Sequence, residues 1–259
     1  MFLLCWDFMT DTAQILAREG GVSIAYHRTP GRAPGVVFLG GFMSDMAGTK
    51  AVALEAWARA RGQAYLRFDY QGHGQSSGRF ADGTIGTWTE DALAALDRLT
   101  EERQILVGSS MGGWIMLKLA MARPARVAAL VGIAAAPDFV VRMWDDFPDE
   151  VGREIERDGY HRAPSQYGAE PYTITRALIE DGRRQLVMDR KIEFFGPVRL
   201  LHGMADPDVP WRVALDLAQA LASADVAVTL VKDGDHRLSR PEDIARLCAT
   251  LDDLCGPAR

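Results

Sequence analysis

A serine flanked by small residues is the first candidate for chemistry in this sequence of 259 residues. Ser110 is the centre of Gly108-Ser109-Ser110-Met111-Gly112, a glycine-x-serine-x-glycine pattern. In such a pattern the serine sits on a sharp turn between a strand and a helix, where its hydroxyl is accessible. The surroundings fit, because an apolar run at 104–107 predicts a buried strand and 112–122 predicts a helix. We interpret Ser110 as a nucleophile; a small-residue turn packed against the sheet is the alternative.

A serine hydroxyl needs a base to take its proton, and the base needs a carboxylate to orient it. His236 follows a predicted strand at 226–231, and Asp206 follows one at 198–202. Both come after Ser110 in the chain, so they are the expected base and acid. Asp208 and Asp138 are rival acids, and the spacing within the motif favours Asp206.

The other histidines have simpler interpretations, because a lone histidine is more often packed or on the surface than catalytic. His73 lies in the glycine-rich loop Asp69–Ser76. It precedes Ser110 in the chain, so we expect it to support its loop rather than act as a base. The remaining ones are interpreted as surface or packed side chains: His27, His161 and His202.

Two backbone amides are candidates for stabilising the oxyanion that forms on attack. The amide of Met111 would lie at the N-terminus of the helix after Ser110, where the helix dipole favours negative charge. The amide of Phe42 follows Gly40 and Gly41, which come directly after a predicted strand. We assign Gly41 to substrate binding, because glycine lets a backbone approach a ligand closely. A plain turn is the alternative for this loop.

The elements that must position these residues alternate regularly along the chain. Apolar runs predict strands at 22–27, 35–39, 64–68, 104–107, 127–134, 198–202 and 226–231. Helical periodicity separates them, at 49–60, 87–99, 112–122, 211–222 and 240–254. Ser239 and Glu242 have the spacing of a capping box for the last helix. Repeated strand-helix alternation predicts an α/β fold with a mostly parallel central sheet and helices on both faces.

The regular pattern breaks down between about 138 and 195, where prolines, charges and aromatic residues mix. We expect this segment to be an inserted helical cap, and the whole chain, 1–259, to form one domain. Aromatic side chains of the cap are expected to contact an apolar acyl group, and Trp144 is the chosen candidate for substrate binding. Packing against the sheet is the alternative for these aromatic residues.

Composition narrows the classes of partner. The net charge is −6 and basic residues are spread along the chain, which argues against nucleic acid. The three cysteines form neither a disulfide framework nor a metal-binding spacing, so we expect a reducing compartment and no metal. No run approaches the ~18 apolar residues of a membrane span. Residues 1–6 are apolar, but they lack the basic start of a secretory signal, and Asp7 and Asp11 follow too early for one. We therefore expect residues 1–9 to be a loosely held extension of a cytoplasmic protein.

Together these residues resemble the α/β-hydrolase superfamily over essentially the whole chain. Within it, one branch is most similar, that of acyl-glucuronide esterases and mitochondrial palmitoyl-protein thioesterases. The segments that carry this likeness are Gly40–Phe42, Gly48–Lys50, Arg67–Tyr70, Gln104–Trp114, Leu200–Met204 and Val209–Trp211. Gln104–Trp114, and Gly113-Trp114 within it, are the specific part. An Ala- and Arg-rich composition suggests a bacterial relative.

The resemblance implies a carboxylic ester or thioester hydrolase that acts on a small-molecule or acyl-protein substrate without a cofactor. Residue by residue it implies a triad of Ser110, Asp206 and His236. A peptidase of the same fold is one alternative, because Asp69–Ser76 also resembles the equivalent loop of acylaminoacyl and dipeptidyl peptidases. A non-catalytic ligand receptor that keeps the fold is the other. A haloalkane dehalogenase is disfavoured, because it needs an acidic nucleophile where this chain has Ser110.

Overall fold

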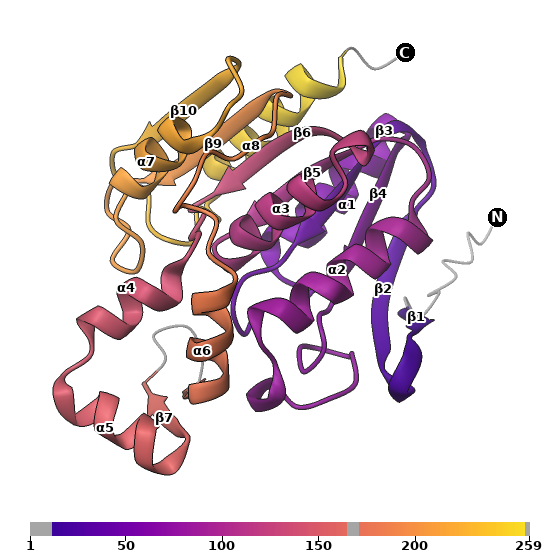
Figure 1. Ribbon diagram of the computed structural model, residues 1–259. Helices are drawn as coiled ribbons and strands as arrows, with labels where there is room; N and C mark the ends of the chain where they lie inside the picture. Colours follow the sequence, from indigo (N-terminus) through magenta and orange to yellow (C-terminus); the bar gives the residue numbers. More distant parts are fainter. Residues whose placement is uncertain (1–11, 165–170, 257–259) are drawn as a thin grey trace, which may run out of the picture.

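The computed structural model describes residues 12–164 and 171–256, so the extension expected at 1–9 lies outside the described residues. Its centre is an eight-stranded sheet with the order β1-β2-β4-β3-β5-β6-β9-β10 (Figure 1). The strands are β1 (Gln14–Ala17), β2 (Ser23–Thr29), β3 (Arg32–Leu39), β4 (Gln63–Phe68), β5 (Gln104–Ser109), β6 (Val127–Ile133), β9 (Val198–Gly203) and β10 (Val226–Val231). β2 pairs antiparallel with β1 and β4, and all other neighbours are parallel. This confirms the predicted mostly parallel sheet; only the edge strand β1 was not expected.

Helices cover both faces of the sheet, which is why the central strands read as continuous apolar runs. In β5, Leu106 packs into one core cluster, whereas Ile105 and Val107 pack into the other. The second cluster lies under α1 (Thr49–Arg61) and α8 (Pro241–Cys255). The first lies under α2 (Ile85–Leu99), α3 (Met111–Ala122) and α7 (Arg212–Ala220). Within the described ranges, no helix combines the length and the apolar character needed to cross a membrane.

A cap is inserted between β6 and β9, as expected, but it is not purely helical. It contains α4 (Phe139–Asp146), α5 (Asp149–Asp158), the antiparallel pair β7 (Tyr160–Ala163) and β8 (Tyr172–Thr175), and α6 (Arg176–Arg184). Gly159 ends α5 in the left-handed conformation, with φ 86°. Thr173, Ile174 and Thr175 then favour a strand, because β-branched side chains suit extended backbone. These elements extend from the sheet at the lower left of Figure 1.

The two ends of the cap are tied to each other and to the sheet domain. The carboxylate of Asp138, just before α4, accepts hydrogen bonds from the amides of Val187 (3.0 Å) and Met188 (2.9 Å), just after α6. Burial raises the pKa of Asp138 although these two bonds oppose the rise. Trp114 of α3 donates its indole N–H to the carbonyl of Gln185, at 3.2 Å. The cap is therefore fastened at its base over the helix that follows Ser110.

Candidate active site

Ser110 lies on a sharp turn between β5 and α3 with φ 53° and ψ −118°. Positive φ is unfavourable for a residue with a side chain, and such strain is typical of functional sites. The glycines on either side make the turn possible. A Cβ at Gly108 would lie 2.4 Å from the carbonyl oxygen of Gly112, and one at Gly112 would lie 2.1 Å from that of Leu39. The glycines of the motif are therefore required by close backbone approach.

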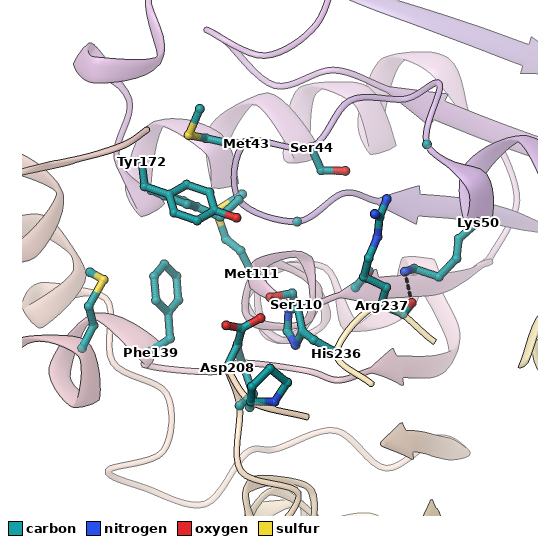
Figure 2. Close-up of a pocket in the computed structure, with 18 of the residues that line it drawn as sticks. Met43, Ser44, Lys50, Ser110, Met111, Phe139, Tyr172, Asp208, His236 and Arg237 are labelled. Atoms are coloured by element: carbon teal, nitrogen blue, oxygen red, sulfur yellow. Dashed lines mark hydrogen bonds between the residues drawn. The ribbon is translucent and has the colours of Figure 1, made fainter. Parts of the chain in front are cut away.

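His236 and Asp206 meet Ser110 at the carboxyl edge of the sheet. Ser110 Oγ lies 3.0 Å from His236 Nε2, and His236 Nδ1 lies 2.8 Å from Asp206 Oδ2. Ser110 comes from the end of β5, Asp206 from the loop after β9 and His236 from the loop after β10. Figure 2 shows the serine and the histidine side by side at the floor of a pocket. The serine can donate to Nε2 while Nδ1–H donates to the carboxylate.

The side chain of Asp206 is buried, and four donors among the described residues surround it. Its Oδ1 accepts the amides of Asp208 and Val209, each at 2.8 Å. Its Oδ2 accepts His236 Nδ1 and also lies 3.2 Å from His202 Nε2. Burial alone would raise the pKa of Asp206, but hydrogen bonds from His202, His236 and Val209 outweigh burial and hold it well below its usual range. The carboxylate is therefore ionised at any ordinary pH.

The rival acids have other roles in the structure. Asp208 contributes its backbone amide to Asp206, and Asp138 ties the ends of the cap. His202, interpreted from sequence as a surface or packed side chain, is fully buried, and its Nε2 lies 3.2 Å from Asp206 Oδ2. His202 lies near the end of β9, four residues before Asp206, and this spacing was the available signal for the contact.

The two expected oxyanion donors lie in turns that converge on Ser110. Met111 is the first residue of α3, and the first amides of a helix have no acceptor within the helix. Phe42 is the second residue of a turn closed by Ser44 N and Gly41 O at 3.1 Å, so its amide does not close the turn. A Cβ at Gly41 would lie only 3.4 Å from Ser110 Cβ, which brings this backbone against the serine.

A cavity of about 780 Å³ opens over Ser110 and His236. Its apolar side comes largely from the cap: Phe139, Met143, Phe147, Tyr172 and Ile174. Figure 2 shows Phe139 and Tyr172 on one side of Ser110, with Lys50 and Arg237 on the other. The charged residues that line the cavity are Asp45, Lys50, Arg142, Asp146, Asp208 and Arg237. Three of these are acidic and three are basic, so the described part of the lining favours neither sign of charge.

Trp144 is not among the residues that line this cavity, contrary to expectation. Its ring packs under the guanidinium of Arg183 in α6, with 4.7 Å between the guanidinium carbon and the ring centre. The reason is the rotation of α4 about its own axis. Its cavity-facing residues follow helical spacing, which turns Trp144 toward α6: Phe139, Arg142, Met143 and Asp146.

The loop that carries His236 is pinned to α1. Lys50 Nζ donates to the carbonyl oxygen of Arg237 and lies 3.4 Å from Ser239 Oγ. Burial, together with the nearby Arg237, lowers the pKa of Lys50 to about 8. Within the loop, the amide of Leu238 donates to Asp235 Oδ1 at 2.9 Å. These contacts restrict where the imidazole can point.

His73 has a different environment from His236. Its Nδ1 lies 3.1 Å from the carbonyl oxygen of Gln71, and its ring packs edge-on against Tyr70, Phe80 and Trp88. Burial lowers the pKa of His73 to about 4. It is therefore neutral near pH 7 and fixed among aromatic rings, which suits a side chain that supports its loop.

One group of potential metal ligands occurs among the described residues, and it overlaps the hydrogen-bonded residues Ser110, His236 and Asp206. Ligand atoms of Asp206, Asp208 and His236 all lie within 4.8 Å of one another. His236 Nδ1 and Asp206 Oδ2 already hydrogen-bond to each other. This hydrogen bond accounts for the proximity of the imidazole and the carboxylate.

The fold is that of an α/β hydrolase, and residues 36–247 match the alpha/beta hydrolase family. The chain belongs to this family. Among curated relatives, it is 44% identical to the mitochondrial palmitoyl-protein thioesterase ABHD10 of rat, over 94% of this chain and 82% of that protein.

Two solved structures are also similar. Mouse alpha/beta hydrolase domain-containing protein 10 has 43% identity and a TM-score of 0.88, and a putative hydrolase from Agrobacterium vitis S4 has 44% identity and a TM-score of 0.90. Each comparison covers 94% of this chain and 98% of the other.

The expected cytoplasmic location is contradicted by these relatives. The rat, mouse, cattle and human proteins are all named as mitochondrial. The expectation rested on cysteine usage and on the lack of a secretory pattern. Cysteine usage separates oxidising from reducing compartments, and it does not distinguish one reducing compartment from another.

Proposed function

We propose that this protein hydrolyses carboxylic esters or thioesters of apolar acyl groups through an acyl-enzyme on Ser110. The observation that carries the proposal is the hydrogen-bonded series Ser110, His236 and Asp206 at the floor of a largely apolar cavity. Relatives of 41–45% identity that are named palmitoyl-protein thioesterases support the choice of reaction.

The first half of the reaction forms the acyl-enzyme. His236 Nε2 takes the proton of Ser110 as Oγ attacks the carbonyl carbon, and the carbonyl electrons move onto its oxygen. The amides of Phe42 and Met111 stabilise this oxyanion. When the tetrahedral intermediate collapses, the bond to the alcohol or thiol breaks, and His236 gives its proton to that leaving group.

The second half repeats these steps with water. His236 takes a proton from water, which attacks the acyl carbon, and then returns a proton to Ser110 Oγ as the acid leaves. Asp206, ionised and held by its donors, keeps Nδ1 protonated and stabilises the imidazolium. No step needs a cofactor.

The two sides of the cavity correspond to the two parts of the substrate. Phe139, Met143 and Tyr172 provide apolar contact for an acyl chain, and the polar side with Lys50 and Arg237 faces the leaving group. In this proposal the chain acts as one catalytic domain, with the cap as the part that contacts the acyl chain.

The test combines covalent labelling with turnover. A fluorophosphonate probe should label the wild type and Ser109→Ala, the matched control at the neighbouring serine, but not Ser110→Ala. A series of p-nitrophenyl esters from acetate to palmitate, with a palmitoyl-cysteine peptide and an acyl glucuronide, then gives the acyl preference. A folded wild type that takes no label would refute the proposal. Turnover of peptide anilides in place of esters would identify a peptidase instead.

A further inference from the structure

His202 is a second histidine at the acid of the site. It lies near the end of β9 and is fully buried. Its Nε2 lies 2.9 Å from the carbonyl oxygen of Val209 and 3.2 Å from Asp206 Oδ2. A carbonyl oxygen and an ionised carboxylate can only accept, so the ring carries a proton on Nε2 and shares it between them.

The surroundings of the other ring nitrogen, Nδ1, determine whether the His202 ring is charged. Its Nδ1 is buried and has no hydrogen-bond partner in the part of the chain that the structure describes. A second proton there would be a buried donor without an acceptor, which is unfavourable. The ring is therefore neutral, and it gives Asp206 a hydrogen bond without adding a positive charge.

We propose that His202 is a positioning residue that acts on His236 through Asp206; this rests on the proposed function. Asp206 Oδ2 is shared by the two histidines, so the bond from His202 fixes the direction in which this oxygen meets His236 Nδ1. Each donor also makes a carboxylate less basic. A less basic Asp206 stabilises the imidazolium of His236 less, so loss of this donor should strengthen that stabilisation and move the acid limb of the pH profile upward.

Other charged groups near His236 come from several elements. Asp235 and Arg237 flank it in the loop, Asp208 lies beside it, and Lys50 of α1 contacts that loop. From the cap, Arg142 lies near enough to interact with both Asp146 and Asp206. All of these stay unchanged in variants of His202, so a difference between such variants reports the bond to Asp206.

The experiment compares pH profiles of kcat/KM for p-nitrophenyl butyrate in the wild type, His202→Gln and His202→Leu. Glutamine places an amide N–H close to the position of Nε2, whereas leucine has a similar volume and no donor. In His202→Leu we expect the acid limb to move up by about 0.5 pH unit and the plateau to fall by about 10-fold. His202→Gln should keep the acid limb near that of the wild type. A merely structural role would lower the plateau without moving the limb.

Three outcomes would overturn the proposal about His202. The first is an unmoved acid limb in His202→Leu, and the second is an equal shift in both variants. The third comes from the wild type itself, if nitrogen NMR of its imidazoles finds the His202 proton on Nδ1 rather than Nε2; this measurement applies even where a variant does not fold. A wild type without esterase activity dependent on Ser110 would refute the proposed function instead, so the two failures are distinct.

Discussion

The carboxyl edge of the sheet and the cap form two sides of one cavity by different physical means. At the sheet edge, hydrogen bonds fix each polar group, as in the 3.0 Å and 2.8 Å contacts that join Ser110, His236 and Asp206. The cap contributes mostly apolar surface, through side chains such as Phe139 and Met143. Directional bonds determine which groups can exchange protons, whereas apolar packing determines which shapes fit. The difference indicates that rate and selectivity can be changed separately.

The largest effect expected from this comparison is between two hydrogen-bonded carboxylates, one from each region. Asp206→Asn should lower kcat/KM by about 10³–10⁴-fold, because the amide no longer holds the required tautomer of His236. Asp138→Asn, at the base of the cap, should stay within about 3-fold in kcat/KM and lower the melting temperature, because its bonds join Val187 and Met188. Steady-state kinetics and thermal unfolding measure both. Equal losses of activity would contradict the separation.

A second effect concerns stability at the sheet edge, where His73 is buried. The fold lowers the pKa of His73 from 6.5 to about 4. Between these pH values the unfolded chain therefore binds more protons than the folded chain. The free energy of unfolding decreases as pH falls from 6.5 toward 4. Between pH 7 and 4.5 His73 should account for about 2 kcal/mol of lost unfolding free energy.

Phenylalanine has a similar ring and cannot titrate, so His73→Phe should be about 2 kcal/mol less sensitive to this change in pH than the wild type. Denaturant unfolding at both pH values gives the difference, and groups common to the two proteins cancel. The same loss in both proteins would mean that His73 is protonated as easily in the fold as outside it.

The smallest effect is expected in the cap. Met143→Ala enlarges the apolar side of the cavity, so the ratio of kcat/KM for long against short p-nitrophenyl esters should change by about 5–10-fold. Trp144→Ala is the matched control on the same helix, because its ring packs on Arg183 rather than in the cavity. Its ratio should remain within about 2-fold of the wild type. A larger change for Trp144→Ala would place the acyl group elsewhere.

The sheet could be predicted from sequence because its signals are local. Strands buried on both faces read as apolar runs, and the elbow around Ser110 needs glycine on each side. The order of Ser110, Asp206 and His236 along the chain then indicated the same three residues that hydrogen bonds join in the structure.

The parts that could not be predicted depend on how helices pack and how loops fold, which the pattern of residue types does not specify. The face of Trp144 depends on how α4 is rotated against α6, and the contact of His202 depends on how the loop after β9 folds back. The start of the last helix also differs. Pro241 begins α8 and Asp243 bonds the amide of Arg240, whereas Ser239 Oγ bonds the carbonyl oxygen of Arg237 instead of capping the helix.

The hydrogen bonds that Asp138 accepts from the amides of Val187 and Met188 close the cap at its base, so the segment between them begins and ends at nearly one point. A segment with adjoining ends can be exchanged as a cassette without altering the span that the rest of the chain must bridge. Residues 139–186 are therefore the unit to transplant between relatives, with Asp138 and the two amides kept as the join.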